Sequence, residues 1–389
     1  MRNTLICTVG TSLFKPNLLG LPTADTFDSW LAKQPQQDRQ YLSFELIESL
    51  RIALADRGWK RLAELLGSIP GNIRLCGAEI NSITDLIQRG YCADKCSLVF
   101  CHSETPEGQQ IAEILQHYYK AKGHRTESQE IKYLQDTQPK LFRTKGLRNL
   151  AKIISQVVRN YNAQFCAINA TGGYKAQIAI GVLMGQALGV PVYYKHELFS
   201  EIIAFPPMPI SLDFNLWLTK SGWLTALDRK EIIAWQQIEE DWDERMEALV
   251  ERIEIDGKQY LELSPTGQIF HETFKNRFES ARDRVLPPPV PINQKKQPRL
   301  SDHNWGNARQ PILNYLQKIT NECAYVQACR THYWNPDLPS PLLFCLKEND
   351  IEGIFSNGTW TVKFIVETSA STVEQRAACV ADLNRITEN

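Results

Sequence analysis

The sequence has no apolar run that approaches the roughly 18 residues needed to span a membrane. It also has no excess of charge of one sign, because 43 Lys and Arg stand against 44 Asp and Glu for a net charge of −1. This balance argues against a wholly basic nucleic-acid binder, although it is compatible with a local basic face. Residues 1–10 read as a short strand and not as a signal peptide, so we expect a cytoplasmic protein that has no membrane partner.

Paired cysteine motifs are also missing. The ten cysteines are scattered and mostly stand inside apolar runs, which favours free thiols in a reducing compartment over a disulfide framework. Cys92 and Cys96 are separated by three residues and Cys101-His102 follows them, but no second ligand pair has zinc-site spacing. The sequence therefore predicts no metal site and no bound cofactor.

Two nucleotide-binding motifs are absent as well. There is no G-x-G-x-x-G and no lysine after G-x-x-x-x-G, which disfavours a standard dinucleotide or nucleoside triphosphate site. Residues 1–206 instead alternate short apolar runs with helical patterns, which predicts a Rossmann-like, doubly wound and mostly parallel α/β sheet. The expected strands are 5–9, 73–76, 98–101, 131–134, 165–168 and 190–194, and the expected helices are 44–66, short segments from 82 and from 106, 146–160 and 173–188.

At 389 residues the chain is long enough for two or three domains. Residues 211–285 combine helical patterns with a short hairpin, which predicts a winged helix-turn-helix domain with tryptophans in its core. Its expected helices are 211–219, 226–250 and 264–284, its hairpin at 253–258 turns at Asp256-Gly257, and its core tryptophans are Trp217, Trp223, Trp235 and Trp242.

Residues 286–300 are rich in proline and predict a stiff, extended linker. Residues 301–389 then predict a compact α+β domain in which helices flank an antiparallel sheet. The expected elements are a helix at 304–323, strands at 324–333, 341–347, 351–355 and 359–368 with a hairpin turn at Asn357-Gly358, and a closing helix at 371–386.

Two polar loops that contain glycine follow apolar strands of the first domain, and ligands of open parallel sheets bind beyond the carboxyl ends of strands. Glycine lets the backbone approach a phosphate, a helix N-terminus offers free N–H groups, and Lys175 adds a mobile charge. Taken alone, Gly172-Gly173 could equally be a tight turn and Lys175 a solvated side chain. Two such loops at corresponding strand ends nevertheless predict an anion site. Its candidate residues are Gly10, Thr11, Ser12, Glu79, Asn81, Ser82, Ser103, Asn169, Thr171, Gly172, Gly173 and Lys175, with Thr105 also on the rim.

These residues resemble the CARF domains of CRISPR-associated proteins. The resemblance spans about residues 1–210 and implies a homodimer that binds a cyclic oligoadenylate across its two-fold axis. The expected ligand is cyclic tetra-adenylate, which acts as an activator. Slow cleavage of this ligand by the sensor itself is a further hypothesis. The resemblance rests on Gly10-Thr11-Ser12, Glu79-Ile80-Asn81-Ser82, Thr105-Pro106-Glu107-Gly108 and, most specifically, Asn169-Ala170-Thr171-Gly172-Gly173-Tyr174-Lys175.

The last domain resembles the RelE domain of CARF–winged-helix–RelE proteins, through residues 356–360, 366–368 and Gln375-Arg376. This resemblance implies a metal-independent endoribonuclease of type III CRISPR antiviral defence, which cuts mRNA on the ribosome. Such an enzyme needs groups that accept and donate a proton and cations that hold the phosphate. Seven Lys and Arg against ten Asp and Glu over 301–389 are few cations for a protein that meets ribosomal RNA. The candidate catalytic residues are Arg330, His332, Lys347, Glu367 and Arg376, with Tyr333 and Lys363 also available.

Two other functions stay open. Residues 350–352 followed by 366–369 have the shape of a PD-(D/E)xK nuclease, although Ser369 stands where that site needs a lysine. A ligand-controlled transcription regulator would read DNA with helix 264–284, whose basic residues alternate with acidic ones. A HEPN ribonuclease is excluded because no Arg precedes a His at the required spacing of four to six residues.

Overall fold

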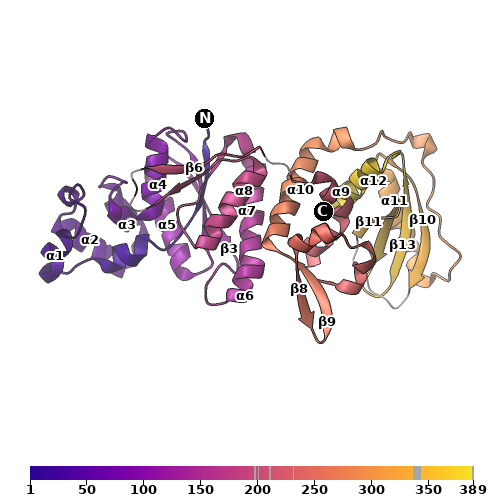
Figure 1. The fold of residues 1–389 in the computed structure, drawn as a ribbon, viewed down its shortest axis with the longest axis horizontal. Coiled ribbons are helices and arrows are strands. Elements are labelled where there is room, and N and C mark those ends of the chain that lie inside the picture. The colour runs from indigo at the N-terminus through magenta and orange to yellow at the C-terminus, as the bar shows by residue number, and fades with distance from the viewer. Residues whose placement is uncertain (197–198, 200, 210–211, 231, 336–342, 388–389) are drawn as a thin grey trace. The chain divides into compact units, whose positions relative to one another are not determined.

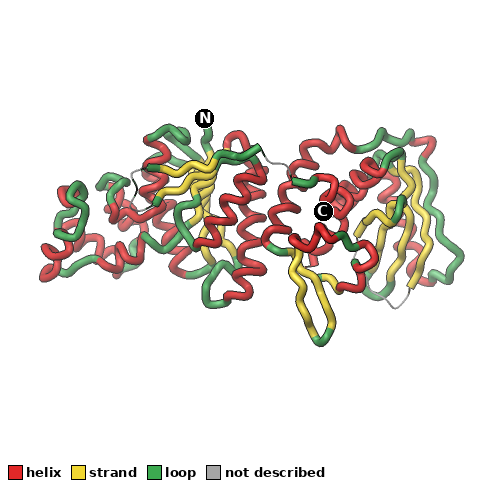
Figure 2. Tube along the Cα trace, in the orientation of Figure 1, coloured by secondary structure: helices red, strands yellow, loops and turns green. Residues whose placement is uncertain are grey.

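A computed structural model describes residues 1–196, 199, 201–209, 212–230, 232–335 and 343–387. The chain divides into two compact units, Met1–Ile210 and Ser211–Asn389. Each unit has a sheet flanked by helices (Figure 1, Figure 2). Among the described residues, no helix is both long and apolar enough to cross a membrane.

The first unit is built on a six-stranded sheet with the order β3-β2-β1-β4-β5-β6. The strands β1 to β5 are parallel, whereas β6 is antiparallel to β5, so the sheet is mostly parallel as the sequence predicted. Its strands are β1 (Thr4–Thr8), β2 (Ser97–Ser103), β3 (Arg125–Ile131), β4 (Cys166–Asn169), β5 (Val192–Lys195) and β6 (Ile202–Phe205).

Helices cover both faces of this sheet, with α7 and α8 on one side and α3, α4 and α5 on the other (Figure 1). Leu5 and Cys7 of β1 point into the core cluster with α3, α4 and α5, and Ile6 between them is equally buried. Because both faces are covered, the strand is apolar without alternation. The helices of this unit are α1 (Phe27–Leu31), α2 (Phe44–Ala55), α3 (Trp59–Gly67), α4 (Gly77–Gln88), α5 (Pro106–Ala121), α6 (Pro139–Leu141), α7 (Leu147–Tyr161) and α8 (Lys175–Leu188).

Two strand predictions in this unit are wrong. Residues 73–76 form no strand, because Arg74–Cys76 is a 3₁₀ turn that buries Leu75 and Cys76 and leads directly into α4. A short apolar run does not distinguish a buried turn from a buried strand. The strand expected at 131–134 lies at Arg125–Ile131 instead, where an edge strand is mostly exposed and carries polar residues. Such a strand gives no apolar signal.

The second unit begins with one long helix, α9, where the sequence predicted separate helices at 211–219 and 226–250. The second of these predictions is wrong beyond residue 230, since residues 233–249 form the short strand β7 and 3₁₀ turns. The hairpin prediction is confirmed, because Asp256 and Gly257 have φ of 51° and 72°, as a two-residue turn requires. The elements are α9 (Phe214–Lys230), β7 (Ile233–Ala234), β8 (Val250–Ile255), β9 (Lys258–Leu263) and α10 (Pro265–Val285).

The rest of this unit is a four-stranded sheet with the order β10-β13-β12-β11, in which every neighbouring pair is antiparallel. The predicted antiparallel sheet and its flanking helices are therefore confirmed. Residues 336–340 lie outside the described part of the chain, and the first two residues of the expected strand 341–347 lie outside it as well. The elements are α11 (Arg309–Glu322), β10 (Val326–Asn335), β11 (Leu343–Lys347), β12 (Asp350–Ser356), β13 (Thr361–Thr368) and α12 (Val373–Ile386).

The hairpin region and this sheet share one core cluster. Trp217 of α9 and Phe274 of α10 belong to the same cluster as Leu343 of β11 and Ala378 of α12. Of the four tryptophans expected in the core, Trp217 and Trp223 are buried, whereas Trp235 and Trp242 only pack against its edge.

The proline-rich segment 286–300 lies along the outer edge of β10. Lys296 N donates to Gln327 O at 2.8 Å, and Arg299 N donates to Cys329 O at 2.9 Å. Thr331 N returns a hydrogen bond to Arg299 O at 3.0 Å. These bonds satisfy backbone groups that an edge strand would otherwise leave open, so the segment is part of the fold of this unit.

Candidate functional site

The candidate ligand site lies where the sheet order of the first unit reverses. The connection from β1 leads to β2 on one side, and the connection from β4 leads to β5 on the other. Because neighbouring connections diverge at this point, a crevice opens beyond the carboxyl ends of β1 and β4. The loops at residues 10–12 and 170–174 therefore meet, as the sequence predicted.

Glu79 ties these loops to helix α4. Its side chain is 1% exposed and accepts hydrogen bonds from Gly10 N at 2.7 Å and from Ser12 Oγ at 3.1 Å. Ser12 Oγ in turn accepts from Ala78 N at 2.9 Å. Burial raises the pKa of the Glu79 carboxyl above its usual value, and the hydrogen bonds from Gly10 and Ser12 offset only part of that rise. Glu79 is thus committed to holding the loop, with both carboxylate oxygens engaged.

A second chain of polar contacts links β4 to β5 through α4. Asn169 Nδ2 donates to Ser82 Oγ at 2.8 Å, and Thr171 Oγ1 donates to Asn169 Oδ1 at 2.7 Å. Lys195 N then donates to Thr171 Oγ1 at 3.1 Å. The side chain of Lys195 forms an ion pair with Asp85 of α4. The hydroxyl of Thr171 therefore bridges two strand ends instead of capping α8.

The two glycine loops touch through their backbones. A Cβ on Gly10 would collide with Gly173 N and stand 3.1 Å from Gly173 Cα. A Cβ on Gly172 would collide with Glu79 Oε1 and stand 2.7 Å from Thr8 O. Gly173 also has φ of +96°, which residues with a side chain rarely adopt. These glycines therefore serve close packing of the two loops.

A cavity of about 490 Å³ opens beside these loops. Of the predicted ligand residues, Ser12, Asn81 and Thr171 line it. Six others lie behind this lining or in the loops that carry it: Gly10, Glu79, Ser82, Asn169, Gly172 and Gly173. The remaining lining residues are Pro16, Asn17, Pro35, Gln37, Asp38, Asn72, Arg74, Gly77, Ala78, Asp85, Lys195 and Phe199.

The last three predicted residues, Thr11, Ser103 and Lys175, do not line this cavity either. Thr11 and Lys175 are exposed, the latter as the first residue of α8. Ser103 ends β2 and bonds to Thr105 Oγ1 at 2.7 Å. Glu79, Asn81 and Ser82 were expected after a strand, and this is wrong, since all three lie on α4.

Sequence reasoning missed two cations that line the cavity, Arg74 and Lys195. Arg74 falls in the segment mistaken for a strand, and Lys195 ends β5, the parallel neighbour of β4. The role of Lys195 could have been predicted from the sequence, because the end of a neighbouring parallel strand faces the same crevice. Asp85 forms an ion pair with Lys195, and Asp38 accepts a hydrogen bond from the backbone N–H of Arg74 at 2.9 Å.

The second unit has a charged group on one face of its four-stranded sheet. Arg330 Nε of β10 lies 3.3 Å from Glu367 Oε1 of β13. His332 Nε2 of β10 lies 2.9 Å from Glu352 Oε2 of β12, and Lys363 Nζ of β13 lies 3.6 Å from Glu352 Oε1. Three predicted catalytic residues thus lie on neighbouring strands, and Glu352 is the partner that sequence reasoning had placed only in the PD-(D/E)xK pattern.

The other predicted catalytic residues lie apart from this group. Lys347 ends β11 and is exposed, and Arg376 lies in the first turns of α12 with its Nε buried and without a hydrogen-bond partner. Over the described residues, no contact joins either of them to His332. Nor do any three His, Cys, Asp or Glu side chains in that part of the chain gather as metal ligands. All ten cysteines are free and buried.

Two solved structures show weak similarity to this chain. Can2 from Sulfobacillus thermosulfidooxidans, solved in complex with cyclic tetra-adenylate, has 10% identity and a TM-score of 0.21 over 49% of this chain and 59% of Can2. Protein VC1899 from Vibrio cholerae has 8% identity and a TM-score of 0.20 over 70% of each chain. The first match spans less than two thirds of Can2, and at TM-scores this low neither likeness establishes a shared fold. Residues 74–208, which include α4 and the loop after β4, match the family described as CRISPR-associated protein (Cas_APE2256).

Proposed function

We propose that this protein is an effector of type III CRISPR defence that binds a cyclic oligoadenylate, cyclic tetra-adenylate in the first place. The ligand binds in the cavity lined by Ser12, Asn81 and Thr171, and binding activates a metal-independent endoribonuclease in residues 301–389. The observation that carries the proposal is this cavity, which lies at the reversal point of the sheet and is lined in part by residues of the segment 74–208 that matches a CRISPR-associated family.

The chemistry of the cavity suits a nucleotide. Ser12, Asn81 and Thr171 give the cavity a neutral polar lining, while Arg74 and Lys195 supply positive charge for phosphate. Lys195 is paired with Asp85, so a phosphate must compete with that carboxylate. A cyclic ligand with two-fold symmetry fits two such cavities in a homodimer, where each chain meets half of the phosphates.

Calorimetry with cyclic tetra-adenylate tests the sensor. Lys195→Ala and Lys175→Ala should each weaken binding by about 1–3 kcal/mol, the range of a charge-assisted contact. Lys152→Ala, on α7 and outside the cavity lining, is the control. Binding of cyclic hexa-adenylate tests the preferred ring size, and binding of linear tetra-adenylate tests whether the ring must be closed. Absence of affinity for every oligoadenylate would contradict the sensor function.

Cleavage of mRNA on translating ribosomes, with and without cyclic tetra-adenylate, tests the effector. We expect ligand-dependent cleavage that leaves a 5′-hydroxyl on the downstream product, because the candidate groups Arg330, His332 and Glu367 can activate the ribose 2′-oxygen without a metal. A 5′-phosphate on that product would favour the PD-(D/E)xK nuclease, in which a metal-bound water attacks. A ligand-dependent gel shift with promoter DNA and no cleavage would favour the transcription regulator.

A further inference from the structure

We propose that His332 is the proton acceptor of the RNA-cleaving site and that Glu352 is the positioning residue that sets its tautomer. The proposal rests on the ribonuclease function proposed above and identifies the base for that reaction. It follows from the geometry of one β-bulge and from the burial of one carboxylate.

The bulge lies in β10. Thr331 pairs with Phe364 of β13, and the next pair joins Tyr333 to Lys363, so His332 is the extra residue. Two residues of a bulged strand then stand opposite one residue of the partner, and the usual alternation of faces is broken. His332 reaches Glu352 and Tyr333 lies beneath Lys363 Nζ, which is 5.7 Å from the ring centroid. Both side chains therefore reach the polar face of the sheet.

Glu352 stands under His332 as a fixed acceptor. Its side chain is 5% exposed, whereas those of His332 and Lys363 are 34% and 32% exposed. A buried carboxylate needs partners for its oxygens, and each oxygen has one here, His332 Nε2 and Lys363 Nζ. Because Glu352 accepts a hydrogen bond from Nε2–H of His332, the neutral ring carries its proton on Nε2 and has none on Nδ1. Among the described residues Nδ1 has no hydrogen-bond partner, so it is free to accept a proton from RNA.

Glu367 is less suited to this role. Its carboxylate pairs with Arg330 at 3.3 Å, and both side chains are more than a third exposed. To take up a proton, Glu367 would have to give up this ion pair. Arg330 and Lys363 flank His332 from β10 and β13, where they can hold a phosphate that carries a developing negative charge.

The reaction balances with these groups and water. The ribose 2′-oxygen attacks the adjacent phosphorus while its proton passes to His332 Nδ1. The bond from phosphorus to the 5′-oxygen breaks, and that oxygen leaves with a proton from water. The products are a 2′,3′-cyclic phosphate and a 5′-hydroxyl, and the imidazolium, stabilised by Glu352, returns its proton to water.

Several other charged groups lie on the same face of this sheet or close to a residue on it. By strand register, Asp350 and Lys347 lie on the same side of the sheet as Glu352 and Glu367. Asp241 acts electrostatically on Cys345, the residue opposite Glu352, and its carbonyl accepts from Lys220. The charged and titratable groups on this face of the sheet, or close to a residue on it, are therefore Lys220, Asp241, Arg330, Tyr333, Lys347, Asp350, Glu352, Lys363 and Glu367.

The test compares full-length variants in the ligand-activated cleavage assay, with circular dichroism to establish that each is folded. His332→Ala should lower the cleavage rate by about 10²- to 10⁴-fold, the range of a lost general base, and added imidazole should restore part of it. Glu352→Gln should lower kcat more than it raises KM. Glu352→Asp, which keeps a carboxylate, should restore part of the lost kcat.

His303→Ala and Glu348→Gln, an exposed histidine and an exposed acid of the same unit, are the matched controls and should cleave like wild type. If wild type cleaves and folded His332→Ala cleaves equally well, the assignment of the base is overturned while the proposed function stands. A kcat of Glu352→Gln equal to that of wild type overturns the positioning role. If wild type cleaves no RNA, both proposals fall.

Discussion

At the scale of single residues, Gly172 shows how the candidate ligand site depends on the absence of a side chain. Its backbone stands between the carbonyl of Thr8 and the carboxylate of Glu79, and Thr8 Oγ1 donates to its carbonyl at 2.6 Å. Glycine is required here for packing, because Gly172 lies where two strand ends and α4 come closest.

Gly172→Ala should therefore lower the free energy of unfolding by about 1–3 kcal/mol, since a Cβ would stand 2.7 Å from Thr8 O and 2.9 Å from Gly10 N. It should also weaken binding of cyclic tetra-adenylate, because relieving the clash displaces the loop that carries Thr171. Gly67→Ala is the control, since a Cβ there meets nothing within 4 Å. Denaturant titration and calorimetry measure both effects, and equal stability of the two variants would contradict the packing argument.

At the scale of elements, the outer edge of β11 is closed by a side chain. Asn384 of α12 accepts from Phe344 N at 3.0 Å and donates to Phe344 O at 2.8 Å, as a neighbouring strand would. Asn384 is 1% exposed, so these bonds lie out of reach of water. The sheet thus ends on a helix at β11 and on the segment 286–300 at β10.

Asn384→Leu keeps the volume but leaves the buried N–H and C=O of Phe344 unpaired. We expect it to lower the free energy of unfolding by about 2–4 kcal/mol, since each unsatisfied group costs about 1–3 kcal/mol. Thr387→Ala, one turn later, loses only hydroxyl bonds to helix carbonyls and should cost less than about 1 kcal/mol. Chemical denaturation measures both free energies of unfolding. An unchanged stability of Asn384→Leu would show that the outer edge of β11 needs no hydrogen-bond partner.

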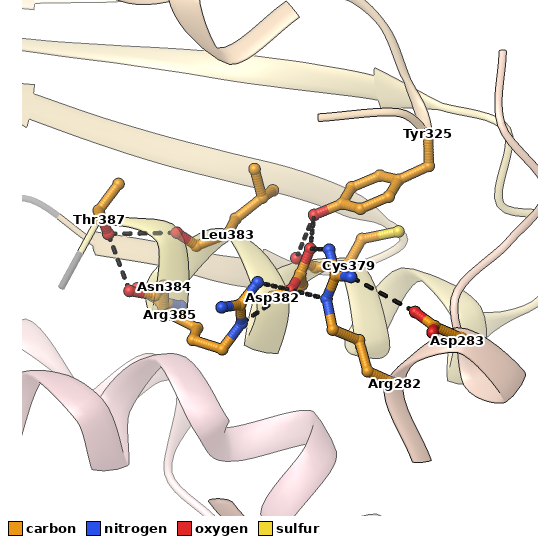
Figure 3. A network of polar contacts seen from close by, with 9 residues as sticks. All are labelled: Arg282, Asp283, Tyr325, Cys379, Asp382, Leu383, Asn384, Arg385 and Thr387. Carbon is orange, nitrogen blue, oxygen red and sulfur yellow. Dashed lines mark hydrogen bonds and ion pairs between the residues drawn. The ribbon is translucent and has the colours of Figure 1, made fainter. Parts of the chain in front are cut away.

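At the scale of the whole molecule, each compact unit has its own core, and a buried charge network joins three parts of the second unit (Figure 3). Asp382 of α12 is fully buried and accepts from Arg282 of α10 at 2.6 and 3.0 Å. It also accepts from Arg385 at 2.9 Å and from Tyr325 OH at 3.0 Å. Burial alone would raise the pKa of Asp382, but the bonds from Arg282 and Arg385 outweigh it and lower the pKa.

Asp382→Asn should destabilise the second unit by about 2–3 kcal/mol. This is less than the roughly 3–5 kcal/mol of a fully buried pair, because the arginine side chains are about a third exposed and can turn to water. Asp283→Asn is the matched control, since its carboxylate also contacts Arg282 but is 93% exposed. Differential scanning calorimetry should show a lower transition temperature for the second unit only. A lower transition temperature for both units would contradict the view that each unit has its own core.

The pH dependence of this network has a definite sign. Because the folded-state pKa of Asp382 lies below its ordinary value, its contribution to stability is complete above that ordinary value and disappears as pH falls through the lowered pKa. The difference between wild type and Asp382→Asn should therefore shrink as the solution becomes strongly acidic.

Local chemistry by itself determined much of this protein. Apolar runs predicted β1, β2 and β4, the Asp256-Gly257 pair predicted its hairpin, and the residues after β1 and β4 predicted a site at their ends. These signals are readable because a strand covered on both faces must be apolar, and a two-residue turn needs positive φ.

Only the tertiary structure decided which distant side chains meet. Lys195 pairs with Asp85, 110 residues away in the chain. His332 of β10 contacts Glu352 of β12, across β13, because of the bulge in β10. The polar strand β3 and the turn at residues 74–76 were missed for the same reason. Their conformations depend on contacts with residues that are distant in the chain. A single sequence does not show which distant residues will be in contact.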